Sequence, residues 1–143
     1  FFSLFRVDRF AQRRTSLQLS TGRYMNADIH PYFVLPPSII SHFGARIGDL
    51  GLIRYQGKTI PGIFADVGPS AKIGELARLA AILLGIPPSP NSGGVGKDVE
   101  YLVFPQSGTT RPNPADVTVE GLTRRILASQ GVAAPAQNAP APQ

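Results

Sequence analysis

The chain has 143 residues, and its 14 Lys and Arg against 9 Asp and Glu give a formal charge of +5. A chain of this length buries roughly two-thirds of the surface that its unfolded form exposes, which supports one domain with a hydrophobic core. The absence of cysteine excludes a disulfide framework, thiolate nucleophiles and cysteine-ligated metal sites. No apolar run approaches the roughly 20 residues that a membrane-crossing helix needs, so we expect no membrane span.

The two ends of the chain differ in composition from the middle. Residues 1–22 are rich in arginine and phenylalanine without a regular period, which predicts an irregular basic arm. Phe1 stands where a start methionine is usual, which indicates a processed or truncated start. Residues 131–143 are almost entirely Ala, Pro, Gln and Asn, so we predict a disordered tail. The domain is expected to occupy residues 23–130.

Three strands are predicted in the first half of this domain. Residues 32–35 are aromatic and β-branched, and Pro36 closes the run, which indicates a short strand. A second strand is predicted at 50–55. The turn at 56–58 contains Gly and joins it to a third strand at 59–65, so these two strands are expected to form a hairpin.

The clearest helix signal covers residues 75–84. Four apolar residues follow helical spacing there: Leu76, Leu79, Ala80 and Leu83. Gly85 and Pro87 mark its end, because glycine suits the position after a helix and proline cannot continue one. The remaining faces are also largely apolar, so we expect the sheet to enclose this helix on most sides.

Two more elements complete the predicted fold. Residues 99–104 form a strand with β-branched and aromatic residues, and residues 119–128 a short helix. Gly and Pro together make about a fifth of the chain, which suits short strands joined by turns rather than a helix bundle. The predicted fold class is therefore mainly β with one core helix (α+β), a small barrel, by analogy of the double-psi kind.

Two carboxylates stand out because they lie on either side of one turn. Asp66 follows the third predicted strand and Glu75 begins the predicted helix, and strand-to-helix loops are common sites for chemistry. Each residue also has a structural interpretation. Asp66 can bond backbone N–H groups in the turn, and Glu75 is favoured in a first helical turn by the helix dipole. Their spacing alone favours the structural interpretation.

Several motifs around these carboxylates together carry a resemblance to a known family. The central ones are Gly48-Asp49-Leu50-Gly51, Gly57-Lys58-Thr59, Ala65-Asp66-Val67-Gly68-Pro69 and Lys72-Ile73-Gly74-Glu75. They are flanked by Ala27-Asp28-Ile29-His30-Pro31-Tyr32 and by Val99-Glu100-Tyr101-Leu102-Val103-Phe104-Pro105. In order and spacing, residues 15–108 resemble the fungal-type chitosanases, glycoside hydrolase family 75.

The resemblance implies endo-acting hydrolysis of a β-1,4-linked glucosamine polymer, chitosan, with inversion at the reacting carbon. Positions that match the family's catalytic pair are Asp66 and Glu75. Inverting glycosidases use one carboxylic acid and one carboxylate about 6.5–9.5 Å apart. We expect Glu75 to be the general acid, because a residue that enters an apolar core helix is readily desolvated. Asp66 is then the base.

Substrate-binding residues are expected among the other acids and the tyrosines. Chitosan is a polycation, so a chain of charge +5 needs acidic residues in its cleft, for which Asp28 and Asp49 are candidates. The chain has no Trp, so stacking on sugar rings falls to tyrosines such as Tyr32 and Tyr101. We expect a polysaccharide as partner, no cofactor or metal, and a secreted or extracellular protein.

The alternative is a catalytically inactive, glycosidase-like binding or structural module. Its basic groups would hold an acidic polymer or partner, and they are Arg6, Arg9, Arg13, Arg14, Arg124 and Arg125. No aromatic-basic recognition motif accompanies them, so nucleic acid is not the expected partner. His30 and His42 lack the spacing of metal ligands and are interpreted as surface or core residues.

Overall fold

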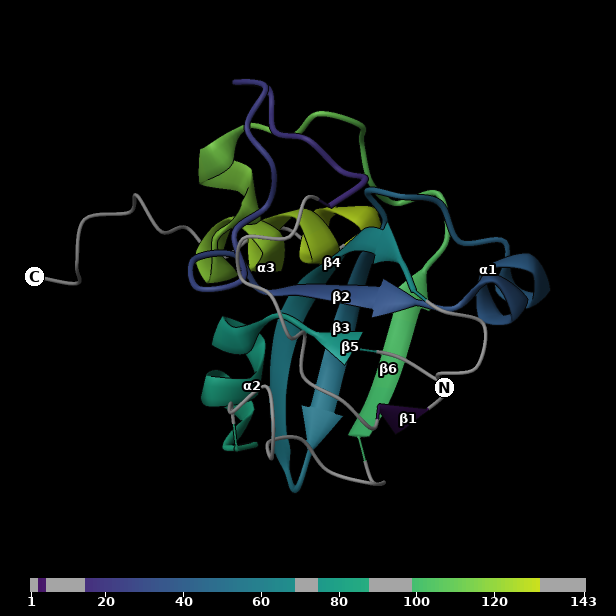
Figure 1. The fold of residues 1–143 in the computed structure, drawn as a ribbon, viewed down its shortest axis with the longest axis vertical. Helices are drawn as coiled ribbons and strands as arrows, with labels where there is room; N and C mark the ends of the chain where they lie inside the picture. The colour runs from purple at the N-terminus through teal and green to yellow at the C-terminus, as the bar shows by residue number, and fades with distance from the viewer. Residues whose placement is uncertain (1–2, 5–14, 69–74, 88–98, 132–143) are drawn as a thin grey trace, which may run out of the picture.

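The computed structural model describes residues 3–4, 15–68, 75–87 and 99–131 (Figure 1). Over these residues it is an α+β fold with a mixed sheet, three α-helices and one 3-10 helix. In chain order the elements are β1 (Ser3–Leu4), β2 (Tyr32–Leu35), α1 (Pro37–Phe43), β3 (Leu50–Tyr55), β4 (Lys58–Val67), β5 (Glu75–Leu76), α2 (Arg78–Leu84), β6 (Val99–Phe104), the 3-10 helix η1 (Pro114–Val117) and α3 (Val119–Ser129).

The sheet has the strand order β1-β6-β3-β4-β2-β5. β3 runs antiparallel to both of its neighbours, β4 and β6. β2 is parallel to β4, and the two-residue strand β5 is antiparallel to β2. The two edge strands, β1 and β5, do not pair with each other in the described part of the chain, so the sheet is open and the predicted barrel is not shown.

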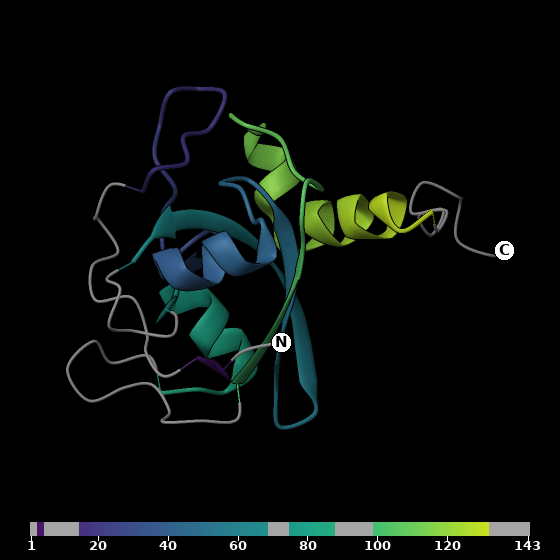
Figure 2. The same cartoon turned by 90° about the vertical axis from the view of Figure 1, so that its right-hand side faces the viewer.

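Both faces of the sheet are covered, and strand β2 separates two cores. Helices α1 and α2 lie on one side of the sheet and α3 on the other (Figure 2). Along β2, Phe33 and Leu35 join the core beneath α2, and Tyr32 and Val34 join the core beneath α3. All four are buried. This explains why β2 is a continuous apolar run without an alternating polar face.

Phe33 is the central aromatic residue of the α2 side. Its ring stacks on Phe64, with centroids 5.9 Å apart and an interplanar angle of 8°, and is tilted against Tyr101 at 5.3 Å. The ring lies against two glycines that face each other across β3 and β4, Gly51 and Gly62. A Cβ atom at Gly51 would lie 3.1 Å from the Phe33 ring and 2.9 Å from a backbone oxygen, so a side chain there must displace something.

Most of the predicted strands are confirmed. The expected strands at 32–35, 50–55 and 99–104 coincide with β2, β3 and β6. The expected hairpin is also present, although β4 extends beyond the predicted 59–65. The helix predicted at 119–128 is α3, and its first turn is capped by Thr118, whose Oγ1 accepts a hydrogen bond from Gly121 N–H at 3.0 Å.

The prediction for residues 75–84 is wrong in two respects. The helix begins at Arg78, because Glu75 and Leu76 pair with β2 as strand β5. It is also covered on one face only, since Ile82 is 51% exposed and Leu83 39% exposed. Its buried residues are Ala80, Ala81 and Leu84.

Helix α1 was not predicted. Pro36 and Pro37 indicate a strand end, but Pro37 is also the first residue of this helix. Proline is well tolerated at this position because the first N–H of a helix has no partner within it. The same two residues therefore end β2 and begin α1.

Part of the predicted arm belongs to the folded body. Ser3 and Leu4 pair with β6, and Leu17 and Leu19 are buried in the core beneath α3. Residues 5–14, and residues 132–143 of the tail predicted at 131–143, lie outside the described residues. Over the described ranges, no helix combines the length and the apolar character that a bilayer crossing requires.

We predict that Gly51→Ala lowers the free energy of unfolding by about 1–3 kcal/mol, because the added methyl group overpacks the space beside Phe33. Urea unfolding measures the loss. Thr59→Ala, an exposed change on the adjacent strand, serves as the control and is expected to cost less than about 1 kcal/mol. Equal urea midpoints for Gly51→Ala and wild type would contradict the close approach of the Phe33 ring to Gly51.

Candidate functional site

Asp66 lies near the carboxyl end of β4, immediately after an irregularity in the sheet. Phe33 is opposite Phe64, but the next residue of β2, Val34, is opposite Asp66. Ala65 is therefore an extra residue on β4, a β-bulge. Bulges bend a strand and redirect the side chains that follow, and they are frequent beside active sites.

Glu75 lies on β5, on the other side of β2. Its register partner is also Val34, so Asp66 and Glu75 occupy the two strands that flank β2, level with the same residue. Two strand spacings put about 10 Å between their Cα positions. The sheet thus brings the two predicted catalytic residues to one level. Glu75 lies in a strand, however, and not in a helix as predicted.

The carboxylate of Asp66 is half-buried, and one of its oxygens is well supplied with donors. Oδ1 accepts hydrogen bonds from Ser16 Oγ at 2.7 Å, from Ser16 N–H at 3.3 Å and from Val67 N–H at 2.9 Å. Within the described residues, Oδ2 accepts none. The Val67 contact agrees with the turn role that the sequence allows for Asp66. Ser16 was missed, since nothing in the sequence relates residues fifty positions apart.

The structure gives Asp49 a different role from the expected substrate binding. Asp49 is 2% exposed. Its Oδ2 accepts from Arg46 N–H at 2.8 Å, and its Oδ1 from Gly108 N–H at 3.4 Å. Both oxygens are used inside the protein, where they join the turn before β3 to the loop after β6.

The two tyrosines expected to bind substrate are also internal. Tyr32 and Tyr101 are both 0% exposed and belong to the two opposite cores. Neither ring offers a surface on which a sugar could stack. The expectation failed because a tyrosine in a strand looks the same in the sequence whether its ring faces the core or the solvent.

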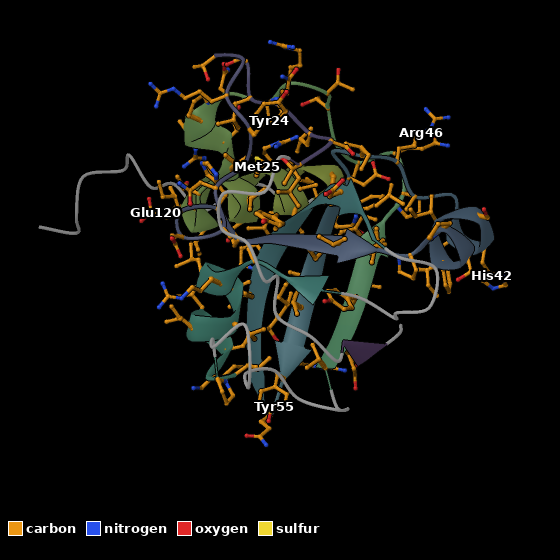
Figure 3. All side chains as sticks on the ribbon, in the orientation of Figure 1. Tyr24, Met25, His42, Arg46, Tyr55 and Glu120 are labelled. Atoms are coloured by element: carbon orange, nitrogen blue, oxygen red, sulfur yellow. The ribbon has the colours of Figure 1, made fainter. Side chains whose placement is uncertain are left out.

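The other two tyrosines lie far from each other, and Asp28 has a partner of its own. Tyr24 is 37% exposed and Tyr55 half-buried, and Figure 3 shows them at opposite ends of the molecule. Asp28 is exposed and forms an ion pair with Arg78 at 3.3 Å. It lies beside α2, whose Leu79 N–H bonds the Ala27 carbonyl at 2.7 Å.

His30 is a core residue. It is 7% exposed, and its Nδ1 accepts a hydrogen bond from Asn26 N–H at 2.8 Å. Burial lowers the pKa of His30 below its ordinary 6.5. In the described residues no three His, Asp or Glu side chains gather in a way that would hold a metal ion.

The second basic group of the alternative interpretation is partly buried. Arg125 Nη2 reaches Thr109 Oγ1 at 3.4 Å, and its Nη1 is buried without a hydrogen-bond partner in the described residues. Burial lowers the pKa of Arg125, and the nearby Asp116 opposes that shift. The first group, Arg6, Arg9, Arg13 and Arg14, lies outside the described residues.

A small hollow of about 70 Å³ lies elsewhere on the sheet. Its lining residues come from β3, β4 and β6, and they are Leu52, Arg54, Thr59, Glu100 and Leu102. Arg54 and Glu100 form an ion pair across it. Neither Asp66 nor Glu75 belongs to this lining.

Comparison with known proteins places the chain in no family. No family model matches it, and no curated protein matches it. Among the solved structures it is similar to one titled "Streptomyces papain inhibitor (SPI)", with a TM-score of 0.47 and 15% sequence identity over 71% of this chain and 93% of that chain. A likeness at this level carries no argument about function.

We predict that acid weakens the fold through His30. Between its lowered pKa and 6.5, the unfolded chain binds a proton that the folded chain does not. The free energy of unfolding therefore falls with falling pH, by up to about 1.4 kcal/mol per pH unit from this one group. Urea unfolding of wild type and His30→Gln at several pH values below 7 should show a flatter pH dependence in the variant.

Nuclear magnetic resonance provides the direct check of this prediction. The chain contains two histidines, so His42→Gln leaves the imidazole of His30 as the sole signal of its kind. We expect its titration midpoint to lie below 6.5. A midpoint at or above that value would contradict the argument.

We also predict that Asp49→Ala destabilises the protein by about 1–3 kcal/mol, because it leaves the N–H groups of Arg46 and Gly108 without their acceptor. Asp28→Ala is the matched control. It removes only an exposed ion pair and is expected to cost less than about 1 kcal/mol. Thermal unfolding of the two variants measures the difference, and equal losses would argue against the internal role of Asp49.

Proposed function

We propose that the protein is an inverting, endo-acting glycoside hydrolase that cleaves a β-1,4-linked glucosamine polymer, with Asp66 and Glu75 as its carboxylate pair. The observation that carries the proposal is the strand register. Both residues are level with Val34 on the two strands beside β2. A Cα separation of about 10 Å is compatible with the carboxyl separation of about 6.5–9.5 Å that inversion requires.

The reaction consumes one water and breaks one glycosidic C–O bond. Asp66, as carboxylate, takes a proton from the water while the water oxygen bonds the anomeric carbon. Glu75, as carboxylic acid, gives its proton to the departing glycosidic oxygen. The attack comes from the face opposite the leaving group, so the product has the inverted configuration.

The assignment of roles rests on the hydrogen bonds of Asp66. An ionised carboxylate only accepts hydrogen bonds, and Oδ1 of Asp66 accepts three. This fits the base, with Oδ2 left to take the proton from water. The sequence favours Glu75 as the acid because it is expected to enter a buried helix. That argument does not apply, because Glu75 belongs to strand β5. Glu75 takes the role of the acid because an inverting pair needs one acid and one base, and Asp66 is the base.

A net charge of +5 disfavours the approach of a polycation, so the distribution of the charges along the chain bears on this proposal. Most of the excess lies outside the described residues. The groups there are Arg6, Arg9, Arg13, Arg14, Lys72 and Lys97, against Asp8 and Asp98. The described residues are close to electrically balanced, and Asp66 and Glu75 are among their acidic residues.

The proposal predicts that wild type releases reducing ends from chitosan and that Asp66→Asn and Glu75→Gln each reduce the rate by more than about a hundredfold. Glu120→Gln is the matched control, because Glu120 lies on α3 with its side chain on the outside of the molecule (Figure 3). The circular dichroism of all variants is compared first, so that unfolded variants are recognised. Full activity in either Asp66→Asn or Glu75→Gln would contradict the assignment of these two residues as the catalytic pair.

A substrate with an activated leaving group separates the two roles. It needs little help from an acid, so Glu75→Gln should regain much of its rate on that substrate, whereas Asp66→Asn should not. Recovery by Asp66→Asn alone would reverse the roles. If wild type is inert on chitosan at acidic and at neutral pH, the hydrolase proposal fails, and the binding module becomes the hypothesis to test.

A further inference from the structure

Ser16 is the side chain that holds Asp66. Of the three hydrogen bonds to Oδ1, two come from this one residue, the shorter from its hydroxyl at 2.7 Å. Ser16 is exposed and lies fifty positions before Asp66 in the chain. The contact therefore depends on how the segment before β2 runs along the end of β4.

The backbone around Ser16 is fixed by its neighbours, not by its own side chain. Leu17 is 2% exposed, and its N–H donates to the carbonyl of Ala65 at 2.9 Å. Thr15 is 4% exposed, and its Oγ1 donates to the Leu17 carbonyl at 2.7 Å and accepts from Met25 N–H at 3.1 Å. Removal of the Ser16 hydroxyl should thus leave the segment in place.

The same contacts tie Ser16 to the β-bulge. Ala65, the extra residue of β4, presents its carbonyl to Leu17, and the next residue, Asp66, presents its carboxylate to Ser16. One short segment thus binds both the bulge and the side chain that the bulge redirects. A carboxylate held on one oxygen by three donors has a restricted rotation, and its other oxygen has a defined position.

We propose that Ser16 is the positioning residue of the hydrolase site: its hydroxyl fixes the Asp66 carboxylate so that Oδ2 is the oxygen that receives the proton from the attacking water. This inference rests on the proposed function. Ser16 does not touch the substrate in this role. It acts through the orientation of Asp66, so its loss lowers the rate of the chemical step more than the binding of the polymer.

The test is the steady-state hydrolysis of chitosan by wild type, Ser16→Ala and Ser16→Thr. We expect Ser16→Ala to lower kcat by about ten- to a hundredfold and to change KM less than about twofold, as for other residues that orient a catalytic group. Ser16→Thr keeps a hydroxyl on the same backbone and should restore kcat to within about threefold of wild type.

Ser20→Ala is the matched control. Ser20 is an exposed serine of the same segment, and its hydroxyl bonds Asn113 Oδ1 at 3.0 Å, away from Asp66. It should leave kcat and KM unchanged. The melting temperatures of all variants are expected within about 5 °C of wild type, since each change removes at most one exposed hydrogen bond.

The outcomes distinguish this inference from the proposed function. If Asp66→Asn is inactive but Ser16→Ala keeps the wild-type kcat, the positioning role is overturned and the hydrolase remains. A low kcat in Ser16→Ala that threonine does not restore, or that Ser20→Ala shares, also overturns it. If wild type is inert, or Asp66→Asn is fully active, the proposed function itself has failed and the role of Ser16 fails with it.

Discussion

Strand β2 has no polar face, and this constraint organises the rest of the molecule. Its four residues point alternately into two separate cores, so both sides of the sheet must be covered at this strand. Helix α2 covers one side, and α3 with the segment around Leu17 covers the other. The pairing of β2 with β4 on one edge and β5 on the other then brings Asp66 and Glu75 to the same level.

The β-bulge at Ala65 is the local departure from this regular arrangement. Up to Phe64 the parallel pair is in register, and after the extra residue the register moves by one. Because a shift of one residue exchanges the two faces of a strand, a bulge can turn a polar residue out of a core that its neighbours occupy. At this point the Ala65 carbonyl accepts a hydrogen bond from Leu17 N–H, which lies outside the sheet.

The sequence predicts the parts of this fold that depend on local patterns. The strands β2, β3 and β6, the hairpin and α3 follow from apolar runs, turns and caps that lie within a few residues of one another. The start of α2 could not be predicted in this way, because Glu75 and Leu76 suit a helix locally but pair with β2, which is distant in the chain. The same holds for α1, where prolines that end a strand also begin a helix.

For the candidate site, the sequence identifies the residue types but not their surroundings. Asp49 directly precedes β3 and Asp66 lies near the end of β4, and both fall in motifs of the same resemblance, yet their environments differ. Asp49 is almost fully buried, and each of its oxygens accepts a hydrogen bond from a backbone N–H group. Its role is therefore structural. Asp66 is half-buried and, among the residues that the structure describes, uses one oxygen, with a serine from another part of the chain as its main donor. Burial and the occupancy of each carboxylate oxygen separate the two aspartates, and both quantities depend on contacts between distant segments.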